Sequence, residues 1–544
     1  MSTTDAPSHG TSDSGGLFTR SATGLVRGVP PRSSLIMNLI PGHPTQTMAA
    51  VLLFALTVGP GGSPYLAMLL VVPMSLAFSY AFGYLTQMIP RSGGDYMLVS
   101  RVIHPAIGYV SVFCMTTAGL LSNAFFALAI TTAGIAPLCS AVGLIGGYPG
   151  LVEFGSTVSS SKGWLLFFGA IIYIISGLMQ LAGWKTLLRI QNVFFVMVTL
   201  ALVICGVVAL FQSKADFITN FNTFASTFTG NSDSYHSTIK AATDAGIDVA
   251  PAFSFSATIP IVAVFATTAI FSYWSTFVGG ELRQASSGKT ARNMALGGII
   301  PLIVVAIFTA IFFRGYGSDF LRAAQANGLP EGIAGPGTSI FYLSSIGVGS
   351  VAFAVIIFVL YMVFWPLLMY ISTLQQTRAI FAMSFDGVLP QGVTKVNSRG
   401  CSWLALVISL IASYIVFIYS VWNATGFFQV LVYALLVQLI AMALVGVAGV
   451  LVPYTRPELY RASTTVKSVL GIPVVAIAGA GAILTAVFVW WAYLHYDALG
   501  TNADIPKLLT WTVGPAILGV LFFIAVRIIK GPEAERVYRE IPPE

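Results

Sequence analysis

Charged residues are scarce in this chain of 544 residues, because Asp, Glu, Lys and Arg together make up only 8% of it. Soluble globular domains carry about 25% charged residues, so the composition excludes a chain built from ordinary soluble domains. Hydrophobic residues reach 56%, the mean hydropathy is +0.86, and the apolar segments are spread evenly along the chain. The composition therefore predicts an integral membrane protein without a large soluble domain.

Cysteine is also rare, with four residues in or beside apolar segments: Cys114, Cys139, Cys205 and Cys401. They lack the spacing of metal ligands, and we interpret them as small buried hydrophobic residues. His, Cys and carboxylate side chains do not cluster at a common depth in the apolar segments, which disfavours a membrane enzyme. We therefore predict no enzymatic activity, no metal site and no cofactor, apart from a coupling Na⁺ or H⁺.

The first 32 residues lack the apolar run of a cleavable signal peptide and are rich in Ser, Thr and Gly. This composition predicts a disordered cytoplasmic tail over 1–32. We expect the membrane core to cover 33–452, two further transmembrane helices to cover 453–529, and a second cytoplasmic tail to cover 530–544. The first apolar helix would then direct membrane insertion.

Hydropathy predicts an all-α integral membrane protein with twelve spans, since about 20 apolar residues are needed to cross a bilayer as a helix. The third and eighth spans are too long for an upright crossing, so we expect them to tilt strongly or to project from the bilayer. The predicted spans are 34–58, 64–88, 106–137, 163–183, 187–211, 258–280, 295–313, 339–376, 402–420, 427–452, 471–492 and 510–529.

Lys and Arg are distributed unequally between the two sides of this topology. Of the 26 in the chain, 20 fall on the side that holds both termini. The remaining six are Lys162, Lys214, Lys240, Arg314, Arg322 and Lys507. Since cytoplasmic loops carry the excess of positive charge, we predict a multi-pass plasma-membrane protein with both termini in the cytoplasm. The net charge of +7 suits an anionic inner leaflet, and nucleic-acid binding is not needed to explain it.

The first span is interrupted at Pro41, Gly42, His43 and Pro44. Broken backbone at membrane depth is tolerated where it is buried against protein or lines a cavity, as in transporters with discontinuous helices. In the sixth span the polar pair Thr267 and Thr268 lies between apolar flanks and predicts a second, weaker break. Each break is followed by one span and then by an over-long span. This common order predicts two repeats of five spans, at about 34–211 and 258–452, inverted relative to each other, followed by two extra helices.

Three further stretches carry a family resemblance. The string Pro90 to Tyr96, PRSGGDY, is similar to the loop between the second and third helices of the amino acid, polyamine and organocation (APC) superfamily. The segments 189–204 and 377–400 and the acidic Glu281 after the sixth helix resemble the same superfamily. The resemblance implies a LeuT-like fold and an amino acid permease that works by secondary active transport with alternating access. Transport would be coupled to sodium or protons, or would proceed by exchange.

If the substrate is an amino acid, as the resemblance implies, a broken helix offers N–H groups for its carboxylate and carbonyl groups for its ammonium. We expect the donors at Thr45, Gln46 and Thr47, and the acceptors in the two breaks. Phe265 or Phe271 is the candidate gate over the substrate. The predicted substrate-binding residues are Ile40, Pro41, Gly42, His43, Thr45, Phe265, Ala266, Thr267, Thr268 and Phe271.

His43 is the only histidine predicted at membrane depth, and an ionisable group there is by default a functional candidate. Three roles stay open for it: a proton carrier, a substrate contact, or a neutral ring hydrogen-bonded to the broken helix end. Some APC members carry an ion-site lysine in the fifth helix, and the matching position here is Val198. A lysine at that site therefore does not provide coupling in this chain.

Ser372 and Thr373 are the candidate sodium ligands, because the resemblance places them near the hydroxyl ligands of a LeuT-type sodium site. Carbonyl groups of residues 37–40 would complete a site made of oxygen atoms. The alternative is that these hydroxyls bond their own or a neighbouring helix. As candidate gating residues we identify two cytoplasmic ion pairs, Arg91 with Asp95, and Glu281 with Arg283 or Arg378.

A polyamine or organic-cation transporter of the same superfamily is the alternative within this class. It is less favoured because the sequence places no carboxylate deep in a span to pair with a second ammonium. A channel or a membrane receptor is the alternative from another class. The expected partners are an amino acid and the lipid bilayer.

Overall fold

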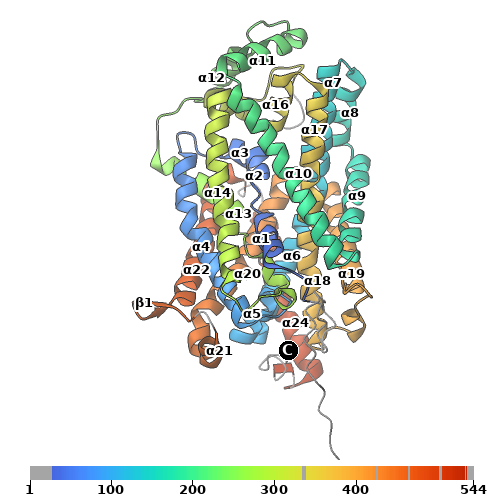
Figure 1. Ribbon diagram of the computed structural model, residues 1–544, viewed down its shortest axis with the longest axis vertical. Coiled ribbons are helices and arrows are strands. Elements are labelled where there is room, and N and C mark those ends of the chain that lie inside the picture. Colours follow the sequence, from blue (N-terminus) through green and yellow to red (C-terminus); the bar gives the residue numbers. More distant parts are fainter. Residues whose placement is uncertain are drawn as a thin grey trace, which may run out of the picture.

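Helices form almost all the regular structure of the protein (Figure 1). The computed structural model describes residues 27–333, 339–423, 427–463, 466–500, 505–532 and 534–535. Within these residues the only strands are β1 (Ser468–Val469) and β2 (Ile472–Pro473), which pair as a short antiparallel hairpin. The predicted tails lie mostly outside the described residues. The last residues of the predicted tail over 1–32 are ordered, because Val29 pairs with Leu282 and α1 begins at Pro31.

Eleven helices in the described part of the chain are long and apolar enough to cross a membrane, and a bent helix pair at residues 31–58 makes up to twelve. The predicted all-helical membrane architecture is thus confirmed. The eleven are α4 (Pro64–Met88), α6 to α7 (Pro105–Gly146), α9 (Lys162–Leu181), α10 (Trp184–Phe211), α13 with η3 (Phe255–Phe277), α14 (Lys289–Tyr316), α17 to α18 (Val351–Phe385), α19 (Trp403–Trp422), most of α20 (Phe427–Thr455), α22 (Val474–His495) and α23 to α24 (Ile505–Lys530).

Two predicted spans, the third and the eighth, differ most from the structure. The third span continues to Gly146 through a π-helical segment, η2 (Ile130–Ile135). The eighth span was predicted at 339–376, but the structure divides this stretch into α16 (Ile340–Val348) and a span that begins at Val351. Helix α16 is terminated by Gly349, which has a φ of 65° that glycine adopts without strain.

The first helix is interrupted where the sequence predicts. Helix α1 (Pro31–Leu39) ends in a turn, and the chain resumes as α2 (Pro44–Gln46), a π-helical segment η1 (Thr47–Val51) and α3 (Leu52–Val58). Pro41 has no N–H to continue α1, whereas Pro44 occupies a first helical position, where the missing N–H costs nothing. The stretch Pro31–Ala49 and the helix Leu52–Val58 are bent by 65° relative to each other.

The sixth helix breaks later than the sequence predicts. Helix α13 (Phe255–Ala269) runs through Thr267 and Thr268, whose hydroxyls donate to the carbonyls of Val264 and Phe265 in their own helix. The break lies at residues 270–273 and is followed by two short 3₁₀ helices, η3 (Trp274–Phe277) and η4 (Gly279–Glu281). The threonines bond within the last turns of the helix, so they do not interrupt it.

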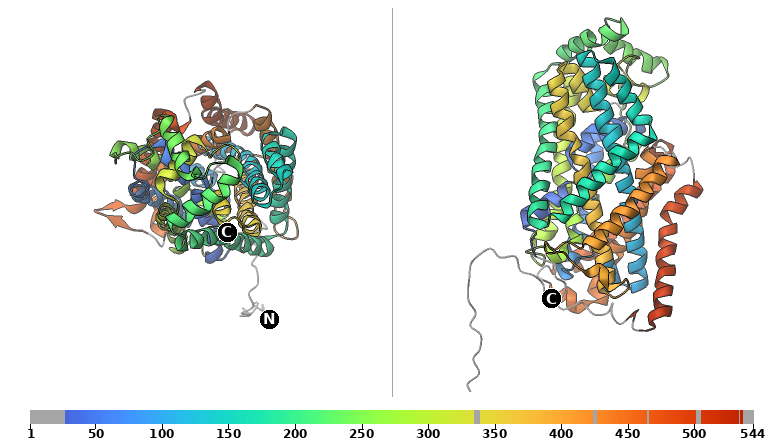
Figure 2. Two further views of the ribbon diagram at one scale, coloured as in Figure 1. Left: turned by 90° about the horizontal axis from the view of Figure 1, so that it is seen from above. Right: turned by 90° about the vertical axis from the view of Figure 1, so that its right-hand side faces the viewer.

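Short helices cover the two ends of the bundle of spans (Figures 1 and 2). One end, here called the α12 end, carries α8 (Pro149–Ser160), α11 (Lys214–Thr229), α12 (Ser234–Asp244) and α15 (Ser318–Asn327). Helix α15 packs on α12 through Phe320 and Tyr235, whose rings stack 4.4 Å apart. The opposite α5 end carries α5 (Asp95–Val102), α21 (Pro457–Ala462) and the hairpin.

Candidate functional site

The first helix break touches the last turn of α13, directly before the second break. Gly42 lies so close to α13 that a Cβ atom added to it would be 2.5 Å from the carbonyl oxygen of Thr268. The next carbonyl, of Ala269, accepts a hydrogen bond of 2.7 Å from the Ser75 hydroxyl of α4. Only glycine permits this approach of one backbone to another, so the contact explains the residue in the first break.

His43 caps the helical segment that follows the first break. Its Nδ1 accepts the N–H of Thr45 at 3.2 Å, and its backbone carbonyl accepts the N–H groups of Gln46 at 3.1 Å and Thr47 at 3.4 Å. The three donors that the sequence analysis assigned to a substrate carboxylate are thus already hydrogen-bonded. The Thr45 hydroxyl also points away from the break and donates to the carbonyl of Val198 at 3.0 Å.

The hydrogen bonds of the His43 ring determine its tautomer. Because the Thr45 N–H can only donate, Nδ1 must be the acceptor, and the ring proton is on Nε2. Nε2 lies 3.1 Å from the hydroxyl oxygen of Thr199, which donates its own proton to the carbonyl of Phe195 at 2.7 Å. The ring also contacts the edge of Phe195, with the centroids 4.9 Å apart. This geometry matches the neutral ring at a broken helix end.

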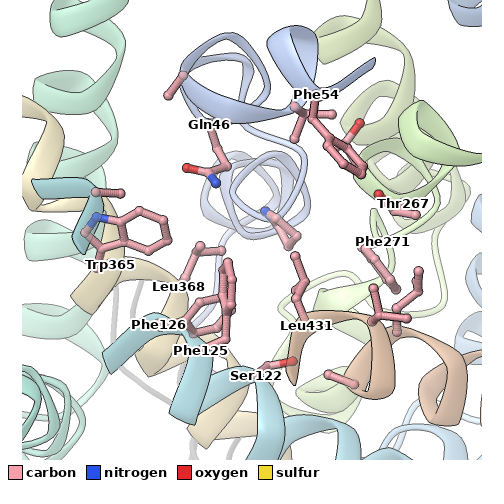
Figure 3. A pocket seen from close by; sticks show the side chains of 18 of the residues that line it. Gln46, Phe54, Ser122, Phe125, Phe126, Thr267, Phe271, Trp365, Leu368 and Leu431 are labelled. Atoms are coloured by element: carbon pink, nitrogen blue, oxygen red, sulfur yellow. The ribbon is translucent and has the colours of Figure 1, made fainter. Parts of the chain in front are cut away.

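A cavity of about 490 Å³ lies beside the two breaks (Figure 3). Pro41, Thr267, Thr268 and Phe271 of the predicted substrate site line it, together with Ser372. It extends toward the α12 end, where Phe54, Gln325 and Ser339 contribute to its wall. Its other main lining residues are Gln46, Ser122, Phe125, Phe126, Trp274, Tyr361, Trp365, Leu368, Leu431, Leu435, Gln438 and Tyr493.

The remaining predicted substrate residues do not line the cavity: Ile40, Gly42, His43, Thr45, Phe265 and Ala266. Their side chains are buried between helices, and their backbone groups are engaged elsewhere. The carbonyl of Ile40 accepts the His43 N–H, that of Phe265 accepts the Thr268 hydroxyl, and that of Ala266 accepts the N–H of Ile270. These three carbonyls, which were predicted acceptors for the substrate, therefore hold protein donors.

The predicted sodium ligands face α6 and not α1. The Ser372 hydroxyl donates to the carbonyl of Gly119 at 3.3 Å. The Thr373 hydroxyl donates to Met369 within its own helix at 2.8 Å and accepts from the amide of Asn123 at 3.3 Å. These bonds correspond to the alternative role of the two hydroxyls, and they do not assemble an oxygen site with residues 37–40.

Glu281 is at the centre of a buried cluster near the α5 end. Arg378 binds both of its carboxylate oxygens, with N–O distances of 2.7 and 2.8 Å, and the two side chains are only 4% and 0% exposed. The indole N–H of Trp184 and the hydroxyl of Ser92 donate to the same carboxylate at 2.7 and 3.0 Å. The segment before α1 joins this cluster, because the Val29 N–H donates to the carbonyl of Glu281 at 3.1 Å.

Asp386 forms a second buried ion pair near the α5 end, which the sequence analysis missed. Arg101 contacts it at 2.7 Å with side chains 1% and 3% exposed, and the Tyr96 hydroxyl donates to it at 2.8 Å. Asp386 is part of the family-like segment 377–400, but 285 residues separate it from Arg101. No sequence pattern joins such distant positions.

The predicted pair of Arg91 and Asp95 is not formed in the described part of the chain. The Asp95 carboxylate instead accepts a hydrogen bond of 2.6 Å from the Ser111 hydroxyl of α6. Burial raises the pKa of Asp95 to about 7, and the Ser111 hydrogen bond opposes this rise only in part. Asp95 is therefore an acid that titrates near neutral pH at the α5 end.

Most of the cavity wall was not predicted from the sequence. Phe125, Phe126, Trp365, Leu368 and Leu431 come from three helices, and in so apolar a chain they are indistinguishable from residues that face lipid. Gln46 is the exception, since a lone amide next to the first break is a signal that sequence reasoning could have used. The sequence-based prediction used Gln46 only as a backbone N–H donor to the substrate carboxylate.

Comparison with known proteins gives one clear match. Residues 33–523, most of the chain, match the family described as amino acid permease. A search of curated proteins found no significant match.

The contact between the breaks predicts that Gly42→Ala destabilises the protein by about 1–3 kcal/mol, because the added methyl overlaps backbone that cannot rotate away. The measurement is the apparent Tm of the purified protein. Gly150→Ala is the matched control, since a Cβ there meets nothing within 4 Å. Equal Tm values for the two variants would contradict the close contact.

The capping role of His43 predicts that His43→Ala lowers stability by about 1–2 kcal/mol or more, while His43→Asn, which keeps a side-chain acceptor, loses less. The pH profile of substrate uptake should be unchanged in His43→Asn, because the ring holds no exchangeable extra proton. His104 caps Ala106 in the same way at an exposed position, so His104→Ala is the control and should cost less. A flattened pH profile in His43→Asn would restore the proton-carrier role.

Proposed function

Because the chain belongs to the amino acid permease family, whose members are transporters and not enzymes, we propose that it moves an amino acid across the plasma membrane by alternating access. The family implies a LeuT-like fold, in which two interrupted helices flank the substrate. One observation carries the proposal: the cavity adjoins both helix breaks and reaches the α12 end, while buried ion pairs close the α5 end. With the α12 end outside, this arrangement supports an outward-facing state.

The orientation in the membrane follows from charge. The α12 end carries Lys214 and Lys240, which belong to the small set of six basic residues. Among the described residues, most Lys and Arg belong to segments at the α5 end, where α24 also ends at Lys530 (Figure 1). We therefore assign the α5 end and both termini to the cytoplasm, as the excess of positive charge requires.

The hydrogen bonding of the candidate coupling residues supports transport without sodium at Ser372 and Thr373. Both hydroxyls are bonded to groups of α6 or of their own helix and not to residues 37–40, and His43 is fixed as a neutral cap. Transport then proceeds by exchange or with a proton bound elsewhere. Asp95, buried and titrating near neutral pH, is the candidate for such a proton.

Counterflow in proteoliposomes tests the proposed function. Vesicles loaded with an unlabelled amino acid should accumulate the labelled form faster than empty vesicles. The reason is that the binding site of a carrier returns to the outside faster when it holds internal substrate than when it is empty. Replacing sodium with choline should leave this uptake unchanged. A channel would show no stimulation by the internal substrate, and a loss of uptake in choline would contradict the sodium-independent mechanism.

The Glu281 cluster predicts which residues keep the cytoplasmic end closed. Glu281→Gln leaves Arg378 buried without its counter-charge, which costs about 3–5 kcal/mol and favours states in which this end is open. The reporter is Cys401, a thiol only 8% exposed whose pKa is raised by burial and which lies in the field of Arg378 and Glu281. Its labelling by a maleimide should become several-fold faster in Glu281→Gln.

Asp319→Asn is the matched control for this measurement. It removes one partner of an exposed pair at the α12 end, Lys214 with Asp319 at 3.4 Å, which is worth about 0–1 kcal/mol. Its labelling rate should equal that of the unmodified protein. Cys401→Ser, which should abolish the signal, identifies the labelled thiol. Unchanged labelling in Glu281→Gln would exclude this cluster as the closing contact.

A further inference from the structure

The cavity has one continuous apolar wall, formed by α6, α18 and α20. Phe125 and Phe126 of α6 pack around Trp365 of α18, with ring centroids 6.3 and 6.5 Å from it. Leu368 and Leu431 extend this surface, and Figure 3 shows all five side chains around the same space. Apart from the indole N–H of Trp365, such a wall gains free energy from apolar groups or from the faces of aromatic rings.

No Asp, Glu, Lys, Arg or His lies among the described residues that line the cavity. In several of its polar side chains an O–H or N–H group is already hydrogen-bonded to a protein acceptor. The hydroxyls of Thr267, Thr268 and Ser372 donate to backbone carbonyls, and one of the two N–H groups of the Gln438 amide donates to the Tyr273 hydroxyl at 2.8 Å. An ionised side chain placed against this wall would lose its hydration without gaining a counter-charge.

Gln46 differs from these residues. Its amide oxygen accepts a hydrogen bond of 3.1 Å from the Tyr361 hydroxyl, which fixes the orientation of the side chain. Figure 3 shows the amide directed into the cavity. Since the oxygen is bound by Tyr361, the N–H₂ group remains as a donor for an acceptor in the cavity, and a carboxylate is the strongest acceptor a ligand offers.

The cavity also meets the carboxyl end of α13, through Thr267, Thr268 and Phe271. The last carbonyl groups of a helix carry partial negative charge and favour a cation. The α-ammonium of an amino acid thus has a favourable place opposite Gln46. Its side chain then points to the apolar wall.

We propose that this cavity selects large neutral amino acids with apolar side chains, and that Gln46 binds their carboxylate while Tyr361 positions Gln46. This inference rests on the proposed function and deepens it. The volume of about 490 Å³ lies within the range of about 300–1,000 Å³ found for small-molecule sites and leaves room for a long or aromatic side chain. Small amino acids leave much of the apolar wall uncovered.

Binding to the purified full-length protein tests the size and charge selection, with ligand-induced thermal stabilisation and calorimetry as readouts. In the series alanine, norvaline and norleucine, each added methylene should tighten Kd about fourfold. Lysine, which replaces the terminal methyl of norleucine by an aminomethyl group, should bind at least 100-fold more weakly than norleucine. Phenylalanine should bind at least as well as norleucine.

Two variants test the assignment of the groups. Gln46→Leu should weaken norleucine and alanine by a similar factor of about 10 or more, because both ligands lose the same hydrogen bond to the carboxylate. Phe126→Ala should weaken norleucine and phenylalanine at least tenfold and alanine much less. Phe167→Ala, at a position of α9 that is 54% exposed, is the matched control and should bind like the unmodified protein.

Tyr361→Phe distinguishes positioning from direct binding. It removes only the hydroxyl that holds Gln46, so it should weaken all amino acids by one common factor that is smaller than the factor for Gln46→Leu. Equal losses in the two variants would assign the carboxylate to the Tyr361 hydroxyl and overturn the role of Gln46.

The outcomes separate this inference from the proposed function. Tight binding of lysine, of glycine or of putrescine, with norleucine weaker, would overturn the selection for large apolar side chains but leave amino acid or amine transport in place. Binding of putrescine, with no binding of any amino acid tested, would indicate that the aromatic rings bind a cation. Failure of every amino acid to bind a protein that remains folded and monodisperse would contradict the proposed function itself.

Discussion

The structure depends on one constraint, that backbone groups released by a helix break must find partners inside the protein, since lipid offers none. At the first break, His43 satisfies three N–H groups with its ring and its carbonyl. At the second break, the carbonyl of Thr268 packs against Gly42 and that of Ala269 is bonded to Ser75. Because these partners are protein groups, the breaks are stable without a ligand. The cavity lies beside them.

The two ends of the molecule are held by different forces. The α5 end is closed by charges that are almost completely buried, in the pairs of Glu281 with Arg378 and Asp386 with Arg101. Such pairs are strongly directional, and losing one partner is far more costly than losing an exposed pair. The Val29 backbone is bonded to the Glu281 segment as well, so these hydrogen bonds tie the start of α1 to the segment after the sixth helix. The α12 end is held by aromatic packing, such as Tyr235 on Phe320, and by partly exposed polar contacts such as Lys214 with Asp319.

Sequence reasoning identified several important residues but assigned them the wrong partners. Thr267 and Thr268 line the cavity, yet their hydroxyls keep α13 intact and the helix breaks at residues 270–273. Ser372 and Thr373 face α6, whereas the prediction required them to face α1. In a membrane helix both the lipid and the protein neighbours are apolar, so the hydrophobic pattern does not reveal the rotation of the helix about its axis. For this reason the prediction chose the right residues in several places but had their side chains facing the wrong neighbouring helix.

The sequence by itself determined the class of protein, the approximate spans, the break at residues 41–44, the asymmetry of positive charge and the family resemblance. Each of these depends on local composition or on a short contiguous string, which one chain displays directly. The tertiary structure decided which side chains share a space: the apolar wall, the direction of Gln46, the capping by His43, and the ion pairs between residues 97 and 285 positions apart. These depend on the packing and rotation of helices that are distant in the sequence. Local hydrophobicity, which is nearly uniform in this chain, contains no record of them.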